Sequence, residues 1–219
     1  MSARLRPTHL PETIPVFPLA GVLLLPRGKL PLNIFEPRYV AMTEAALATP
    51  ERLVGMIQPV GEGDGGAPTL YPVGCAGRIV SFSESDDARY RYLITLLGVC
   101  RFTIAEEIEG QGGFRRVRAD WGRWHGDLEP PGALAIDRAQ LLATLKGYFA
   151  ANDISADWDA IAEAPDDRLI TTLSMVCPFS APEKQALLEA EDAAARARAV
   201  MALMEMAARG GDEADRPAH

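Results

Sequence analysis

The sequence predicts an α+β protein in which a sheet-rich first part with one helix precedes a bundle of helices. Up to residue 124, short apolar runs alternate with polar residues and are separated by Gly and Pro, which is typical of β-strands. From Leu134 the apolar spacing changes to steps of three and four residues, as in amphipathic helices. The charge changes at the same place, because residues 1–125 carry 14 basic and 13 acidic residues whereas residues 126–219 carry 8 and 17.

The first elements are three apolar runs followed by a helix. Residues 14–17, 22–25 and 30–35 lie between Pro and Gly residues and are predicted to be buried strands. Pro37 suits the first position of a helix, where its missing N–H costs nothing. Tyr39, Met42 and Ala46 then fall on one face of that helix, which we expect to pack against the strands.

The middle of the chain predicts one more strand and two hairpins. The strand is residues 53–58, and residues 59–72, rich in Gly and acidic residues, are predicted to form a surface loop. The hairpins pair residues 74–82 with 90–98, across a polar turn, and residues 99–108 with 114–121, across a Gly-rich turn.

The second half predicts helices with recognisable ends. Ser180, Pro182 and Glu183 have the spacing of a helix start, and Asp192 is a suitable cap for a last helix ending at residue 208. The predicted organisation is an arm (1–13), a β domain (14–124), a linker (125–133), a helical bundle (134–208) and a disordered tail (209–219).

Three groups of residues resemble one known family. F-P-L, L-P and P-L-x-I-F-E-x-R-Y, in this order between Phe17 and Tyr39, resemble the start of the substrate-binding domain of the Lon protease family. They are closer still to small standalone proteins that carry only that domain. G-x-x-G-R-I-V from Gly74 and G-x-x-R-F from Gly98 resemble its central strands, and K-Q-x-L-L-E from Lys184 resembles its helices. The resemblance covers residues 14–208 and implies a PUA-like β pseudo-barrel with one helix, followed by a C-terminal α-helical bundle.

The resemblance also implies a function. The implied function is the binding of unfolded or damaged polypeptide segments, independent of ATP. The resemblance also allows a Lon-type protease as a further partner. We expect no enzyme, because no G-x-x-x-x-G-K-[ST] phosphate loop and no Ser–Lys protease segment occur in the sequence. A hydrolase is the weaker alternative, since no serine lies in G-x-S-x-G and the site is predicted to hold no catalytic residue.

The candidate peptide-binding residues lie around the start of the first helix. They are Phe35, Glu36, Arg38, Tyr39 and Met42, expected beside a groove between the β domain and the bundle. The three apolar ones also suit a core. Glu36 and Arg38 also suit a structural role, paired with each other or with Arg101, because polar groups near a core are usually retained by hydrogen bonds.

One basic cluster supports an alternative, an RNA-binding PUA-like module. It consists of Arg115, Arg116, Arg118 and Arg123. Charged residues also protect exposed sheet edges, and the acidic second half disfavours a nucleic-acid partner. Edge protection is therefore the preferred interpretation.

No metal, cofactor or membrane is expected to take part. Glu84, Asp86 and Asp87 lie in a predicted turn and lack the spacing of a calcium loop. The three cysteines show no CxxC spacing and are expected to be buried free thiols. No apolar run approaches the roughly 20 residues that span a bilayer, and no signal-peptide core is present, so a cytoplasmic location is expected.

Overall fold

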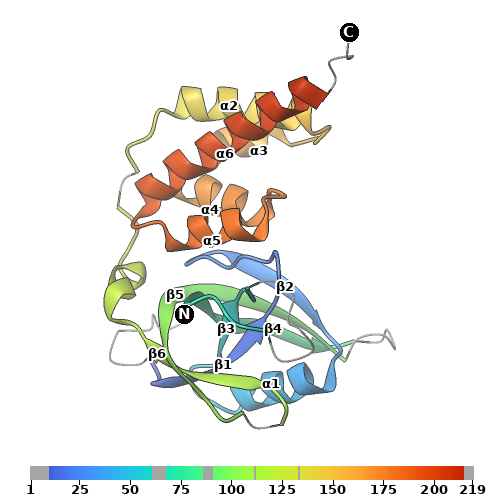
Figure 1. The fold of residues 1–219 in the computed structure, drawn as a ribbon, viewed down its shortest axis with the longest axis vertical. Helices are drawn as coiled ribbons and strands as arrows, with labels where there is room; N and C mark the ends of the chain where they lie inside the picture. The colour runs from blue at the N-terminus through green and yellow to red at the C-terminus, as the bar shows by residue number, and fades with distance from the viewer. Residues whose placement is uncertain (1–9, 61–67, 86–90, 111, 133, 215–219) are drawn as a thin grey trace. The chain divides into compact units, whose positions relative to one another are not determined.

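The computed structural model describes residues 10–60, 68–85, 91–110, 112–132 and 134–214, with side chains up to residue 208. The chain forms two compact units, Met1–Pro130 and Pro131–His219. The strands of the first unit are β1 (Thr13–Pro18), β2 (Lys29–Ile34), β3 (Leu53–Ile57), β4 (Val73–Glu84), β5 (Tyr92–Ile108) and β6 (Arg115–Asp120). Its helices are α1 (Pro37–Leu47) and the 3-10 helix η2 (Gly122–Leu128). The α+β class predicted from the sequence is confirmed (Figure 1).

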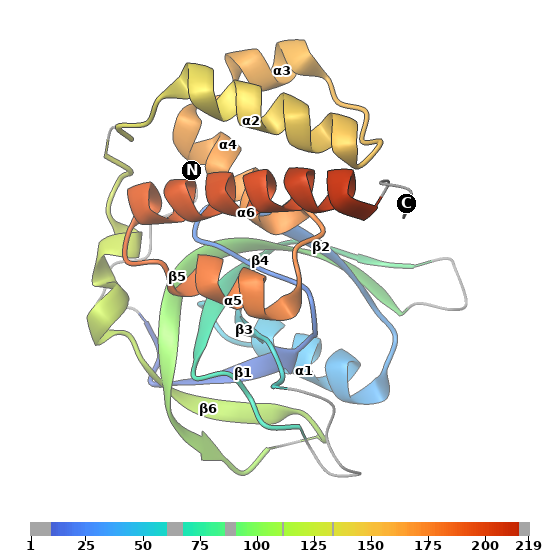
Figure 2. The same ribbon diagram turned by 45° about the horizontal axis from the view of Figure 1, so that its top comes forward.

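Five of the six strands close into a barrel. The sheet order is β2-β5-β4-β3-β1-β6, and β6 pairs in addition with β5, so that only β2 of these strands lies outside the closed ring (Figure 2). The 17-residue β5 makes this possible, because its first part pairs with β2 and β4 and its last part pairs with β6. The two predicted hairpins therefore share one strand. Register shifts between Ala76 and Gly77 and between Ile104 and Glu106 let the paired strands bend.

The barrel is filled by apolar side chains around Phe102, which is fully buried. Gly55 and Gly74 lie against its ring, since a Cβ at either position would come within 3 Å of it. Helix α1 packs on β1 and β3 and buries Tyr39 and Met42. The predicted helix start at Pro37 is confirmed.

Residues 22–25 are not a strand, contrary to the prediction. Leu23, Leu24 and Leu25 are buried, but their segment crosses the face of the sheet. A Cβ on Gly77 would lie 2.7 Å from Leu24 Cδ2, and one on Gly98 would lie 1.9 Å from the Leu25 carbonyl oxygen. The run is apolar because it covers β4 and β5, whose edges are already paired with other strands there.

The second unit is helical, as predicted. Its helices are α2 (Arg138–Ala151), α3 (Trp158–Glu163), α4 (Asp166–Val176), α5 (Ala181–Glu189) and α6 (Ala193–Ala214). The capping box of Ser180 and Glu183 forms, and the Asp192 carboxylate accepts a hydrogen bond from the Ala195 N–H. Helix α6 packs against α2, α4 and α5. In the described residues, no helix combines the length and the apolar character needed to cross a bilayer.

Two predicted flexible segments contain more structure than expected. Residues 122–128, which overlap the predicted linker, form η2 with Trp124 buried, and the two units divide after Pro130. Helix α6 continues to Ala214, six residues into the predicted tail, through Gly210 and Gly211. Most of the predicted arm (1–9), part of the Gly-rich loop (61–67) and the last five residues lie outside the described residues.

Candidate functional site

Four large apolar side chains are exposed around the outer end of β2, β5 and β4, where these strands extend beyond the barrel. Phe35 is 58% exposed, Val80 49%, Phe82 42% and Leu93 39%. We call these four residues the outer-sheet patch. Exposed apolar side chains that gather in one area commonly mark interaction sites, so this patch is the first candidate for a site.

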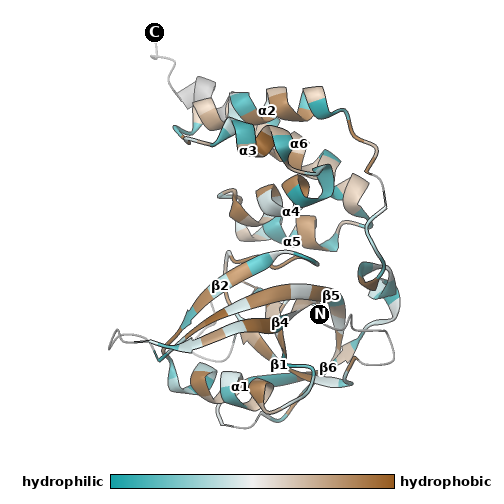
Figure 3. Cartoon of the chain, turned by 180° about the vertical axis from the view of Figure 1, so that it is seen from behind, coloured by the Kyte–Doolittle hydropathy of each residue, from teal (hydrophilic) through white to brown (hydrophobic). Residues whose placement is uncertain are grey.

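Strand pairing brings these four residues to the same end of the sheet. Leu93 lies opposite Asn33 of β2 and Ser83 of β4, and Phe82 lies opposite Ile94. Phe35 directly follows Ile34, the last residue of β2. Alternation puts Phe82 and Leu93 on opposite faces, so apolar groups are exposed on both sides of the extended strands. Figure 3 shows the apolar stretches along β4 and β5.

A hollow of about 690 Å³ adjoins the patch at Val80. It lies between the end of α1 and the adjoining part of β4, and its lining residues are Ala48, Thr49, Pro50, Arg52, Arg78, Ile79 and Val80. The Arg78 Nε donates a hydrogen bond to the Glu51 carbonyl oxygen and so holds the chain after α1 against β4. The hollow is large enough for one or two side chains of a segment bound on the surface.

The five predicted site residues fall into three environments. Phe35 is exposed and belongs to the patch. Tyr39 and Met42 are buried, and the Tyr39 ring lies 4.1 Å from that of Phe17, which places both residues in the core. Burial raises the pKa of the Tyr39 hydroxyl.

Glu36 and Arg38 pair with each other, which is one of the two arrangements predicted from the sequence. The Arg38 Nε donates to Glu36 Oε2 at 2.8 Å, and both side chains are about half exposed. The alternative pairing with Arg101 is wrong, because Arg101 binds another carboxylate.

Sequence reasoning missed the exposed Val80, Phe82 and Leu93, although apolar residues at consecutive positions of a strand indicate that both of its faces carry apolar groups.

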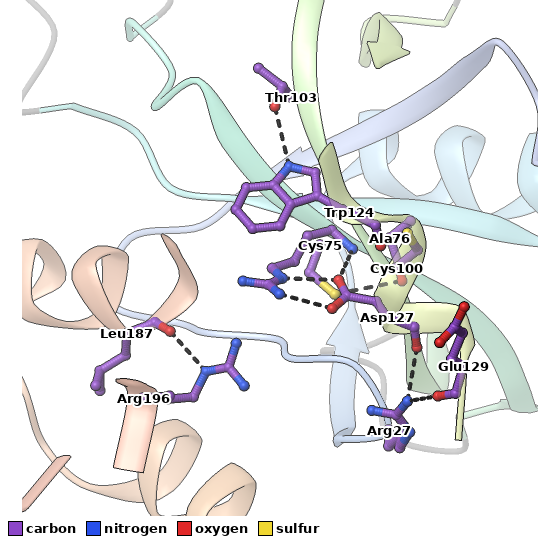
Figure 4. A network of polar contacts seen from close by, with 11 residues as sticks. Arg27, Cys75, Ala76, Cys100, Thr103, Trp124, Asp127, Glu129, Leu187 and Arg196 are labelled. Atoms are coloured by element: carbon purple, nitrogen blue, oxygen red, sulfur yellow. Dashed lines mark hydrogen bonds and ion pairs between the residues drawn. The ribbon is translucent and has the colours of Figure 1, made fainter. Parts of the chain in front are cut away.

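Arg101 and Asp127 are the centre of a buried polar network, of which Figure 4 labels Asp127, Trp124, Thr103 and Arg27. The Arg101 Nε and Nη2 donate to the two carboxylate oxygens of Asp127 at 2.9 and 2.8 Å, and the Arg101 guanidinium lies 4.0 Å from the centre of the Trp124 ring. The Trp124 Nε1 donates to Thr103 Oγ1 at 3.2 Å, and Arg27 Nη2 donates to the Asp127 carbonyl oxygen at 3.0 Å. The network fastens η2 to β5. Because Arg101 and Asp127 are almost fully buried, we assign them a structural role.

Two of the four clustered arginines, Arg115 and Arg118, pair with neighbouring carboxylates. Arg115 pairs with Glu107 at 2.5 Å, and Arg118 pairs with Glu12 at 3.0 Å and Glu106 at 3.1 Å. Edge protection does not explain these arginines, because β6 has a paired strand on both sides.

Among the described residues, no group of three or more His, Cys, Asp or Glu could hold a metal ion. Asp86 and Asp87 lie outside the described residues.

The three thiols are free and buried. Burial raises the pKa of Cys100 to about 12 and that of Cys177 to about 11.

The nucleophile in thiol chemistry is the thiolate, so we expect almost no reaction of the folded protein with a disulfide reagent at pH 8, and full reaction in denaturant. Counting the released chromophore before and after adding denaturant tests this. Rapid labelling of the folded protein would contradict the buried, protonated state.

The sequence matches a family model described as the ATP-dependent protease La (LON) substrate-binding domain, over residues 13–206. It is 29% identical over 210 residues to Lon protease 2 of Sorangium cellulosum, covering 93% of this chain and 26% of that protein. It is 24% identical over 198 residues to Lon protease 2 of Myxococcus xanthus, covering 89% of this chain and 24% of that protein. The chain thus spans about a quarter of the length of these relatives.

Two solved structures have the same fold. One is the crystal structure of a Lon N-terminal domain protein from Xanthomonas campestris, with a TM-score of 0.61 and 20% identity over 87% of this chain and 97% of that one. The other is the N-terminal domain of Mycobacterium avium complex Lon protease, with a TM-score of 0.62 and 19% identity over 88% of this chain and 98% of that one.

Proposed function

The chain belongs to the Lon substrate-binding domain family, and on this premise we propose that it binds unfolded or damaged polypeptide segments without catalysing a reaction. The observation that carries the proposal is the outer-sheet patch, where four large apolar side chains are exposed on neighbouring strands. An unfolded segment exposes apolar side chains that a folded protein buries. Contact with the patch would remove apolar surface of both partners from water.

The surroundings of the patch suit a weak and tolerant binding site. Phe35 is followed directly by Glu36, whose exposed pair with Arg38 supplies a polar rim. The backbone of the patch is held by strand pairing, so little conformational entropy is lost on the side of this protein. Two of the four arginines that favoured RNA, Arg115 and Arg118, pair with acidic side chains, which weakens their attraction for phosphates.

The proposal extends to place and partner. Three free thiols suit a reducing compartment such as the cytoplasm, where we place this activity. The curated relatives are named Lon proteases, and a Lon-type protease is the partner to which bound segments would pass.

A fluorescence anisotropy titration tests the proposed function. The probe is a labelled protein that is reduced and carboxymethylated so that it cannot refold, with ATP added or omitted. We expect binding in the micromolar range, equal with and without ATP, and an uncut probe by mass spectrometry. A probe that stays free at high micromolar protein would contradict the function, and a cleaved probe would show an enzyme instead.

Variants locate the binding surface. Phe35→Ser combined with Phe82→Ser removes both aromatic groups of the patch, and we expect affinity to fall about tenfold or more. The matched control is Val176→Ser, which removes a 74% exposed apolar side chain from α4 of the other unit. Equal binding by the two variants would show that the patch does not bind the client.

A further inference from the structure

Within the described sheet, strand β2 pairs along one edge and leaves its other edge open. The sheet bonds it to β5 alone, with register from Lys29 opposite Leu97 to Ile34 opposite Tyr92. The other five strands close into a ring, beyond which residues 79–84 of β4 extend and pair with β5. An open strand edge presents backbone N–H and C=O groups at regular spacing, which is a template for a further strand.

The bonds to β5 determine which backbone groups of β2 point outward. The Gly98 N–H donates to the Gly28 carbonyl oxygen at 2.8 Å, and the Arg91 N–H donates to that of Ile34 at 2.8 Å. Backbone groups alternate in direction along a strand, so even-numbered residues face β5. The N–H groups of Lys29 and Asn33, and the carbonyl groups of these residues and of Pro31, therefore lie on the open edge.

Pro31 fits this arrangement and disfavours one possible partner, a second copy of β2. Its missing N–H falls on the outer side, where it removes no bond to β5. If a second copy of β2 paired antiparallel and centred on this position, Pro31 of one copy would lie opposite Pro31 of the other. Neither proline has an N–H to donate to its partner. Proline and lysine on an edge strand are common devices against such self-association. A segment from an unfolded chain can still use both outward N–H groups.

The side chains of β2 match a client of varied sequence. Lys29, Pro31 and Asn33 are exposed, whereas Leu30 and Leu32 on the other face are half-buried. An added strand would place alternate side chains beside Leu30 and Leu32 and cover their exposed parts. Recognition through the backbone depends little on the client's sequence, which is what a protein that binds many unfolded chains requires.

We propose that the open edge of β2 binds an extended polypeptide segment with apolar residues at alternate positions, as a seventh strand. The inference rests on the proposed function and gives it a mechanism. Phe82 of the patch lies opposite Ile94, which lies opposite Leu32, so Phe82 shares the face of the sheet that carries Leu30 and Leu32. Backbone pairing would hold the segment while its apolar side chains lie on the face that carries Leu30, Leu32 and Phe82.

Amide hydrogen exchange followed residue by residue by NMR tests the inference directly. The probe is a ten-residue peptide with valine at alternate positions. In the free protein we expect fast exchange at Lys29 and Asn33 and slow exchange at Leu30 and Leu32, whose amides bond to β5. Saturation with the peptide should slow Lys29 and Asn33 at least tenfold. Unchanged exchange at both amides in the saturated complex would overturn the inference.

A pair of variants gives an independent readout. Asn33→Pro removes one outward N–H and leaves the bonds to β5 intact, whereas Asn33→Ala removes the same side chain and keeps the N–H. We expect the proline variant to bind the peptide about tenfold more weakly than the alanine variant, the loss of roughly one backbone hydrogen bond. If the proline variant does not fold, a peptide N-methylated at consecutive amides replaces it and should show the same loss on the unchanged protein.

The outcomes separate this inference from the proposed function. Equal binding by the two variants, together with continued binding of the carboxymethylated protein, overturns the edge and leaves the function standing. Failure of the carboxymethylated protein to bind removes both. A dimer of this chain in light scattering that Asn33→Pro dissolves would assign the edge to a second copy, and so would also overturn the inference.

Discussion

Asp127→Ala is expected to lower the free energy of unfolding by about 3–5 kcal/mol. The Asp127 carboxylate accepts hydrogen bonds from the Arg101 guanidinium, through Nε and Nη2, and from the Arg101 backbone N–H at 2.9 Å. Side-chain exposure is 5% for Arg101 and 10% for Asp127. Removing the carboxylate leaves a buried guanidinium without its counter-charge, whose desolvation is then not offset. It also removes one of the contacts between η2 and β5, of which the bond from Trp124 Nε1 to Thr103 remains.

Glu36→Ala provides the matched control. It breaks an ion pair of similar length, 2.7 Å, whose two side chains are 40% and 54% exposed. Water solvates the arginine that remains, so we expect a loss of about 0–1 kcal/mol. Urea unfolding followed by tryptophan fluorescence measures both, because Trp121 and Trp124 lie in the same unit as the two ion pairs. Equal losses for the two variants would contradict the structural role of Arg101 and Asp127.

The sequence predicted well where the signal is local. Pro37 begins α1, and Ser180 with Glu183 forms the capping box of α5, because such signals act within one turn of helix. Apolar runs between Gly and Pro, together with alternation in the hairpins, likewise indicated the strands that form. The family resemblance added the order of these elements along nearly the whole chain.

Prediction failed where the deciding partner lies far away in the sequence. Arg101 meets Asp127, 26 residues further on, and this contact turns part of the predicted linker into an ordered 3-10 helix. Residues 22–25 have the apolar composition of a strand, but the edges of β4 and β5 are already taken, so they cover the sheet instead. Composition shows that a residue is buried and does not show against what.

The candidate site shows the same limit. Phe35 was predicted to contact peptide and is exposed, whereas Tyr39 and Met42 of the same motif fill the core. Their spacing identifies one helical face, and a buried face and a binding face look alike in sequence. The open edge of β2 could not be predicted at all, because it depends on which strands close the barrel.

Gly98→Ala is expected to cost about 3 kcal/mol, the upper end of the range for overpacking a core. A Cβ at this position would lie 1.9 Å from the Leu25 carbonyl oxygen and 2.7 Å from its carbon. Both are backbone atoms, which cannot rotate away as a side chain can. The Gly98 N–H donates to Gly28 and its carbonyl accepts from Arg27, both at 2.8 Å, so β5 cannot shift without breaking these bonds.

Gly126→Ala is the control within the same unit. Among the described residues, no atom lies within 4 Å of the position that a Cβ would take there, so we expect a change within about 0.5 kcal/mol. Urea unfolding midpoints measure the difference. Because Gly28 precedes β2 directly, displacing Gly98 should also weaken the pairing of β2 with β5, seen as faster amide exchange at Leu30. A Gly98→Ala protein with the midpoint of the control and slow Leu30 exchange would show that the crossing segment and β2 do not depend on this glycine.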